Sequence, residues 1–342
     1  MSSISMKRIE QLKQALSQRI LILDGAMGTM IQSYGLKEAD FRGDRFVEHS
    51  CQLKGNYDVL SLTRPDIIKA IHIAYLEAGA DIIETNTFNG TTIAQSEYQT
   101  DAYVYDINFA AAQLARKAAD KFTADNPHKP RFVAGSLGPT NRTCSLSSDT
   151  NNAGLRSISF DELVPAYSQQ AKALIDGGVD ILMVETVFDS LNAKAALFAI
   201  QNLLKAENLS LPIWVSWTIT DAGGRILSGQ TIEALWISVS YVDPFCVGLN
   251  CAFGAETMRP YLEELSRVAE TLVSVHPSAG LPNELGEYDD SPEYMAGVLR
   301  EFAESGLVNI VGGCCGTTPE HIRAIAKAVA TLRPRRVPKN KP

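Results

Sequence analysis

The feature that most constrains the fold of this chain is an alternation of short apolar runs with stretches of helical periodicity. Eight such runs, many rich in β-branched residues, recur along the sequence. They are Ile20–Leu23, Asp81–Thr85, Arg131–Ala134, Asp180–Glu185, Ile213–Thr218, Phe245–Leu249, Thr271–Val275 and Val308–Val311. The amphipathic stretches between them include Ile67–Ala78, Asn108–Lys121, Leu163–Asp176 and Asn192–Lys205, and a last one, Pro319–Leu332, follows the eighth run. Eight strands joined by helical crossovers predict a (β/α)8 TIM-type barrel.

The alternative fold is an open, doubly wound parallel sheet. A ninth candidate strand, Asp58–Leu62, makes the strand count ambiguous. We interpret it as an extended part of the long first loop, because Arg64 and Pro65 stop it before the next helix. The open sheet usually carries a Gly-x-Gly-x-x-Gly motif after its first strand, and this sequence has none there. The barrel is therefore favoured.

The chain divides into one large domain and a short tail. We expect residues 1–332 to form a single barrel that begins with a short surface helix, in which Ile9, Leu12 and Leu16 have helical spacing. The tail, residues 333–342, is basic and rich in proline and lacks an apolar period, as a linker does. This tail indicates that the barrel is one module of a longer protein.

Charge and apolar content exclude two classes of partner. The formal net charge is −8, and Lys and Arg cluster only in the last dozen residues, so a nucleic-acid surface is not expected. No segment approaches the length of apolar sequence that a membrane span requires. The N-terminus also lacks the apolar core of a secretory signal, which predicts a cytoplasmic protein. In that reducing compartment its six cysteines are expected to be buried, metal-bound or reactive rather than disulfide-bonded.

Three of the cysteines lie directly after predicted strands. Cys251 follows the sixth run, and Cys314 and Cys315 follow the eighth. In a barrel, these positions lie on the rim where functional groups collect. Glycines flank the adjacent pair and allow backbone angles that turn both sulfurs toward one point. Three thiolates with one open position are typical of a catalytic zinc site. The alternative interpretation is that these cysteines are ordinary buried residues of the core.

Five motifs carry a resemblance to a known family. They are LDGAMGTMIQ at 23–32, EAGADIIETNTF at 77–88, GSLGPTNRT at 135–143, GLNCA at 248–252 and NIVGGCCGTTPEHI at 309–322. Together they resemble the homocysteine S-methyltransferase family, and most of all the N-terminal module of cobalamin-dependent methionine synthase. The resemblance implies a barrel that binds zinc through the three cysteines. It also implies that Asp24 and Glu185 bind the ammonium group of L-homocysteine, and that the backbone near Gly25 and around Ser136 binds its carboxylate.

The resemblance also implies an activity, which is methyl transfer to the thiol of L-homocysteine to give L-methionine. In the methionine synthase reading, methylcobalamin is the direct methyl donor and a methyl-folate recharges it. Both would be bound by other modules, in the same longer chain or in separate subunits. Two alternatives remain open. One is a free-standing methyltransferase that uses betaine or S-methylmethionine, and the other is a non-catalytic module in which zinc only ties two strands together.

The sequence departs from the family pattern at one position. After the seventh strand, related modules often read PNAG, and their Asn can fill the fourth position on zinc before substrate binds. This chain has Ser278 there, so its resting fourth ligand is not the usual one. His276 is a candidate for a residue that contacts the metal ligands without binding the metal itself. His321, on the last helix, is expected at the surface, and Asn250 is expected only to order the turn before the first cysteine.

Overall fold

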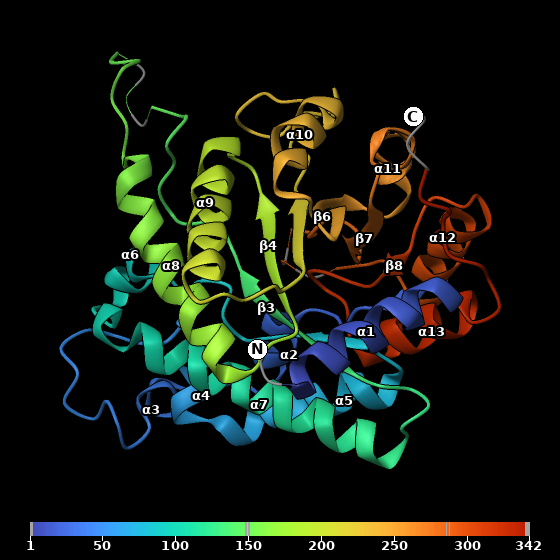
Figure 1. Ribbon diagram of the computed structural model, residues 1–342. Coiled ribbons are helices and arrows are strands. Elements are labelled where there is room, and N and C mark those ends of the chain that lie inside the picture. The colour runs from blue at the N-terminus through green and yellow to red at the C-terminus, as the bar shows by residue number, and fades with distance from the viewer. Residues whose placement is uncertain (1–2, 148, 150, 285, 287, 339–342) are drawn as a thin grey trace.

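The computed structural model describes residues 3–147, 149, 151–284, 286 and 288–338 and shows eight parallel strands ringed by helices (Figure 1). The strands are β1 (Leu21–Ile22), β2 (Ile82–Glu84), β3 (Phe132–Leu137), β4 (Ile181–Val187), β5 (Ile213–Trp217), β6 (Cys246–Gly254), β7 (Leu272–Ser278) and β8 (Ile310–Val311). The longer helices are α1 (Ser3–Gln18), α5 (Pro65–Ala78), α7 (Val104–Asp125), α8 (Phe160–Gly177), α9 (Ser190–Ala206), α11 (Arg259–Val268), α12 (Pro292–Glu304) and α13 (Pro319–Val329). The shorter ones are α2 (Met27–Ser33), α3 (Glu38–Arg42), α4 (Leu60–Thr63), α6 (Thr92–Gln95) and α10 (Ile232–Val239), with 3-10 turns at Ser96–Tyr98, Asp101–Tyr103, Ser240–Val242 and Glu256–Met258.

The sheet closes on itself. Its strand order is β1-β8-β7-β6-β5-β4-β3-β2, and every neighbouring pair is parallel. The two ends of this order meet at a parallel bridge between Leu23 and Ile82. The N–H of Asp24 donates to the carbonyl of Ile82 at 3.0 Å, and the N–H of Asp81 donates to the carbonyl of Ile22 at 2.7 Å. These bonds confirm the predicted (β/α)8 barrel and exclude the open sheet.

Side chains, not solvent, fill the inside of the barrel. Phe132, Met183, Trp214 and Ile310 come from different strands and belong to one fully buried cluster. A larger cluster packs the outer faces of the strands against the surrounding helices. Because both faces of each strand are buried, the strands read in sequence as continuous apolar runs rather than as alternating ones.

Helix α1 closes the bottom of the barrel, where the strands begin. Leu12 and Leu16 belong to the cluster inside the barrel, and both are almost completely buried. The helix was therefore predicted correctly, but its predicted position on the surface is wrong, because its apolar stripe plugs the barrel. Below the strands, Arg19 pairs with the buried Asp81 at 2.6 Å, and Arg8 pairs with the buried Asp180 at 2.6 Å. These pairs tie α1 to the starts of β2 and β4.

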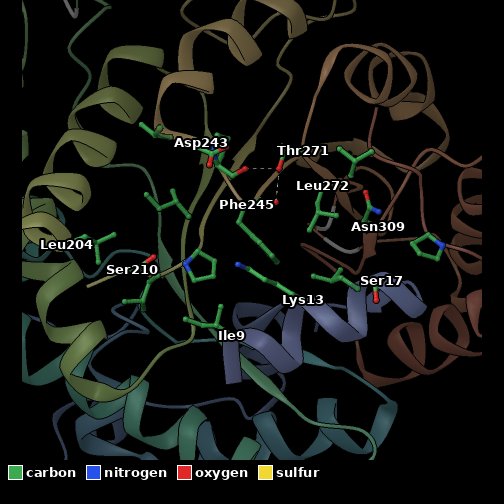
Figure 2. Close-up of a pocket in the computed structure, with 18 of the residues that line it drawn as sticks. Ile9, Lys13, Ser17, Leu204, Ser210, Asp243, Phe245, Thr271, Leu272 and Asn309 are labelled. Carbon is green, nitrogen blue, oxygen red and sulfur yellow. Dashed lines mark hydrogen bonds between the residues drawn. The ribbon is translucent and has the colours of Figure 1, made fainter. Parts of the chain in front are cut away.

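A wide cavity lies at this bottom end, away from the cysteines. It has a volume of about 1440 Å³ and lies between α1, the end of α9, the starts of β5 to β8 and the tail. Figure 2 shows Lys13 and Ser17 of α1 facing Phe245 and Leu272 across it. Only one acidic residue, Asp243, is among the residues that line it. Lysine and arginine side chains line this cavity, but no cysteine or histidine among the described residues does, so the thiol cluster predicted from the sequence lies elsewhere.

Two further predictions concern irregular segments. The candidate strand 58–62 is not extended, because α4 forms there and Val59 and Leu60 are both buried in a helical turn. The division at residue 332 stays a prediction. Within the tail, Arg335 is buried and its guanidinium donates to the carbonyls of Ser266 and Ala269, each at 2.6 Å. No helix in the described part of the chain is long and apolar enough to cross a bilayer.

Candidate active site

The polar groups at the mouth of the barrel, where the strands end, fall into two halves. Four consecutive strands supply the first half, which we call the carboxylate half: Asp24 after β1, Glu84 in β2, Ser136 in β3 and Glu185 in β4. The second half, which we call the thiol half, comes from β6 to β8: Cys251 in β6, Ser278 at the end of β7, and Cys314 and Cys315 after β8. A small molecule bound at the mouth can therefore contact acids at one end and sulfur at the other.

The three cysteine sulfurs converge. The Sγ atoms of Cys251 and Cys315 are 3.6 Å apart, and the Sγ atoms of Cys251, Cys314 and Cys315 all lie within 4.8 Å of one another. In a tetrahedral site with metal–sulfur bonds of about 2.3 Å, the sulfurs lie about 3.8 Å apart. The donor set is soft, as zinc and other thiophilic metals prefer. These three residues therefore fit a single metal ion.

Cys251 reaches this point because β6 is irregular there. The strand pairs regularly with β7 up to Cys251 and Pro277, and the register then shifts before Gly254 meets Ser278. Cys251 itself has a φ of 58°, in the left-handed region that residues other than glycine seldom adopt. Such bulges re-aim a side chain. Here the bulge turns the Cys251 thiol toward the two cysteines that follow β8.

Cys314 and Cys315 are adjacent, so a regular strand would point them to opposite faces. Instead, β8 ends before them, and the N–H of Cys314 donates to the carbonyl of Pro277 at 2.8 Å. The N–H of Thr317 donates back to the carbonyl of Cys314 at 3.1 Å and closes a turn. Gly316 lies in this turn at a φ of 79°, which glycine adopts without strain. The turn brings both sulfurs to one side, as the flanking glycines predicted.

Two hydroxyl groups contact the sulfurs. Ser278 Oγ donates to the Sγ of Cys251 at 3.5 Å, and the hydroxyl of Tyr288 hydrogen-bonds to Cys315. Burial and the neighbouring sulfurs raise the pKa of Tyr288 to about 12, so it remains a donor. Hydrogen bonds to Cys251 and Cys315, together with burial, hold the pKa of Cys314 well above that of a free thiol. Without a cation, the cluster therefore resists carrying three thiolates at once.

The carboxylate half is a group of three acids joined by hydrogen bonds, in which Asp24 and Glu185 are buried and Glu84 is half-buried. The backbone N–H of Glu84 donates to Asp24 Oδ2 at 3.0 Å, and the side chains of Glu84 and Glu185 hydrogen-bond to each other. Ser136 Oγ donates to one oxygen of Glu185, and Thr186 Oγ1 donates to the other at 3.4 Å. Asp24 Oδ1 is buried and has no hydrogen-bond partner among the described residues. This oxygen keeps its capacity to accept a hydrogen bond.

Burial, more than mutual repulsion, governs the ionisation of these acids. It raises the pKa of Glu185 to about 7 and the pKa values of Asp24 and Glu84 well above their usual ranges, and the charge of Glu185 raises both further. No Lys or Arg forms an ion pair with any of the three in the described part of the chain. A bound cation would satisfy the group and shift all three toward the carboxylate form.

His276 and His321, the two histidines considered as candidates, lie in different environments. His276 lies in β7, and one of its ring nitrogens is within 4.8 Å of ligand oxygens of Glu84 and Glu185. Burial lowers the pKa of His276 to about 3, so its ring is neutral, and neither ring nitrogen has a hydrogen-bond partner within the described residues. His321 is buried, so its predicted surface position is wrong. It caps α13, where its Nδ1 accepts from the N–H of Thr318 at 3.2 Å.

Sequence reasoning missed Glu84 and Tyr288. Glu84 had a readable signal, because strands β2 and β4 share one pattern, DIIET at 81–85 and DILMVET at 180–186. In both, a buried Asp directly precedes the strand and a Glu-Thr pair lies at its carboxyl end. Tyr288 had no such signal, since it comes from the segment between β7 and α12 that folds back over the cysteines. Only the tertiary structure places its hydroxyl there.

Gly25 and Ser136 were predicted near the substrate carboxylate, and their roles stay predictions. A Cβ at Gly25 would lie 2.7 Å from Thr317 Oγ1, so the turn after β1 has no room for a side chain. Helix α2 begins two residues later, and its first N–H groups have no carbonyl partner within the helix. Ser136 already has partners, because its N–H donates to Thr85 Oγ1 at 3.0 Å and its hydroxyl holds Glu185.

Fold and site together define an α/β-barrel protein with three converging cysteine sulfurs at the mouth of the barrel. Comparison with known families agrees with this description. The family model for homocysteine S-methyltransferase matches residues 21–329. The chain therefore belongs to the homocysteine S-methyltransferase family.

Solved structures of a homocysteine methyltransferase share the fold. The metallated form of MmuM from Escherichia coli is 25% identical, with a TM-score of 0.68, and the match covers 93% of this chain and 99% of that one. The oxidized form of the same enzyme is 24% identical, with a TM-score of 0.70, and the match covers 92% of this chain and 97% of that one. The likeness thus extends over almost the full length of both proteins.

Proposed function

We propose that this protein transfers a methyl group to the thiol of L-homocysteine in a zinc-dependent reaction that yields L-methionine. The observation that carries the proposal is the pairing of a three-sulfur cluster with a buried, cation-free group of acids across one barrel mouth. Homocysteine has matching ends, a thiol and an ammonium group. Family membership and the metallated MmuM structure support the same conclusion.

Cys251, Cys314 and Cys315 would hold the zinc ion. Bound there, zinc would lower the pKa of the substrate thiol and, because three cysteine sulfurs already over-balance its charge, leave that sulfur an electron-rich nucleophile at neutral pH. Ser278 and Tyr288 would contribute hydrogen bonds to the cysteine sulfurs. Such bonds orient the ligands and fix where the substrate sulfur enters.

The carboxylate half would bind the amino-acid end of the substrate. Asp24 Oδ1 and the oxygens of Glu84 and Glu185 offer acceptors to an ammonium group, and the acids lack any other cation among the described residues. The first turn of α2, next to Gly25, offers N–H donors to the substrate carboxylate. With both ends held, the substrate sulfur points toward the thiol half. The methyl group then forms a bond to this sulfur, the thiol proton leaves, and the bond from the methyl group to its donor breaks.

An open fourth position separates a catalytic site from a structural one. No fourth His, Cys, Asp or Glu joins the three cysteines among the described residues, whereas a closed structural zinc site takes four protein ligands. Ser278, where relatives often have Asn, donates its hydrogen to Cys251 instead of presenting a lone pair to the cluster centre. These observations favour an enzyme over a module in which zinc only ties two strands together.

Two methyl donors have specific support. The sequence motifs resemble the cobalamin-dependent methionine synthase module, which favours methylcobalamin carried by another module, with methyl-folate recharging it. The match to 99% of the MmuM chain favours a barrel that works alone with a small onium donor such as S-methylmethionine or betaine. We propose methylcobalamin as the donor and hold the onium compounds as the alternative.

The test is an assay of methionine formation by the zinc-loaded protein with each donor in turn. We expect turnover with free methylcobalamin, and none with S-methylmethionine or betaine. Turnover with an onium donor alone would replace the donor assignment but leave the homocysteine site intact. Failure with every donor, together with no binding of homocysteine, would overturn the proposed function. The Cys314→Ser protein serves as the metal-free control.

A further inference from the structure

Asn250 connects the two halves of the mouth. It is completely buried in β6, next to Cys251, and its side-chain amide reaches the neighbouring strand β5 and, beyond it, β4. Its Oδ1 accepts from Ser216 Oγ at 2.6 Å and from the backbone N–H of Thr186 at 3.2 Å. Its Nδ2 donates to Thr186 Oγ1 at 2.8 Å. Asn250 was predicted only to order the turn before Cys251. Its three side-chain hydrogen bonds to β4 and β5 exceed what that role requires.

The residues on both sides of this link have strained backbones. Thr186 has a φ of 55° and Cys251 a φ of 58°, and both values are rare for residues with a side chain, most of all for β-branched threonine. Each residue also lies where its strand leaves regular register with the next one. Such conformations persist only where surrounding contacts impose them. The Asn250 amide binds Thr186 directly, and Asn250 precedes Cys251 in the chain, so this anchored residue is bonded to one strained residue and covalently joined to the other.

The direction of the hydrogen bonds extends the link to Glu185. An amide Nδ2 can only donate, so Thr186 Oγ1 is the acceptor in that bond and keeps its own hydrogen. Thr186 then donates to Glu185 Oε2 at 3.4 Å. Ser136 donates to the other oxygen of the same carboxylate. A directed path therefore runs from Asn250 through Thr186 to the carboxylate that faces the mouth.

We infer that Asn250 is a positioning residue that fixes Cys251 in the thiol half and Glu185 in the carboxylate half relative to each other. This inference rests on the proposed function, because it takes the distance between the thiol half and the carboxylate half to match the length of homocysteine. Asn250 touches neither metal nor substrate in this role. It keeps the two halves at a separation that one molecule can span. The hydrogen bonds from Asn250 to Thr186 and from Thr186 to Glu185 hold the carboxylate in place.

The experiment compares substitutions along the path with one matched control. Thr186→Val keeps the size and the β-branch but removes the hydroxyl, whereas Thr186→Ser keeps the hydroxyl. Asn250→Ala removes the whole link. Asn309→Ala is the control, because Asn309 is equally buried at the opposite end of the barrel, where its Oδ1 accepts from the N–H of Val273 at 2.9 Å. For each protein, zinc affinity is measured by competition with a chelator, homocysteine affinity by calorimetry, and KM and kcat by turnover.

We expect Thr186→Val to weaken homocysteine binding about tenfold and to raise KM more than it lowers kcat, with zinc affinity unchanged, since one hydrogen bond to a charged group is lost. Thr186→Ser should restore wild-type affinity. Asn250→Ala should weaken zinc and homocysteine binding together, each about tenfold or more, because it releases both strained residues. Asn309→Ala should reduce thermal stability and leave both affinities unchanged.

The inference is overturned if Asn250→Ala behaves like Asn309→Ala, or if Thr186→Val and Thr186→Ser bind homocysteine equally well. Should Asn250→Ala fail to fold, the Thr186 pair still decides the question, because neither substitution changes the packing volume by more than a few atoms. If the wild-type protein binds zinc but not homocysteine, the proposed function fails instead, and that outcome is distinct from the two above.

Discussion

Replacing Glu185 by Gln separates substrate binding from metal binding. Gln keeps the size of the side chain, and its oxygen can still accept from Ser136. Its amide group, however, presents N–H donors where the ammonium group and the Thr186 hydroxyl need acceptors. A hydrogen bond between charged groups contributes about 1.5–3 kcal/mol, which corresponds to roughly 10- to 150-fold in affinity. Because Glu185 is not one of the three cysteines that we propose as metal ligands, zinc affinity should stay within about twofold of wild type.

The assay is calorimetric titration of the zinc-loaded proteins with L-homocysteine at pH 8. Burial raises the pKa of Glu185 only to about 7, so pH 8 favours the carboxylate form of this side chain. Chelator competition gives zinc affinity in the same preparations. The exposed glutamate Glu48 supplies a charge-matched control as Glu48→Gln, which should bind both ligands like wild type. Equal losses of zinc and homocysteine in Glu185→Gln, or no loss of homocysteine at all, would refute the assignment.

Two further outcomes follow from the same geometry. Cys314→Ser should abolish tight zinc binding while circular dichroism shows a folded barrel, because the apolar core does not depend on the mouth; an unfolded variant would make the metal structural. Because burial raises the pKa of Glu185 to about 7, the ligand-free protein gains stability from this carboxyl at low pH, in full below about 4.5, and loses it as pH rises through about 7. The melting temperature should fall across this window, and L-methionine, which has an ammonium group but no thiol, should bind more tightly as pH rises through it. A Glu185→Gln protein that shows the same pH dependence would contradict this origin.

The barrel was predictable from sequence because its signal is repeated. Each strand is buried on both faces, so each appears as a continuous apolar run, and helices of ordinary length separate most of them. The position of α1 was not predictable in the same way. Its apolar stripe fits a surface helix as well as a plug, and only the closed barrel leaves an opening at the bottom that Leu12 and Leu16 can fill.

The convergence of Cys251, Cys314 and Cys315 was predictable for a similar reason, since their positions after strands place them on one rim. What the sequence could not reveal is how Cys251 turns inward, because a non-glycine residue at positive φ leaves no compositional trace. Two contacts of the site residues were equally unpredictable from the sequence. Neither the bond between Glu84 and Glu185 nor the contact of Tyr288 with Cys315 is local in sequence, so both depend on the tertiary structure.

X-ray absorption at the zinc edge, with and without L-homocysteine, tests the central claim most directly. Before substrate is added, the zinc-loaded protein should show three sulfur ligands and one lighter atom. After addition, the shell should contain four sulfurs at about 2.3 Å. A shell that stays the same in the presence of bound homocysteine would contradict direct activation of the substrate thiol by the metal at Cys251, Cys314 and Cys315.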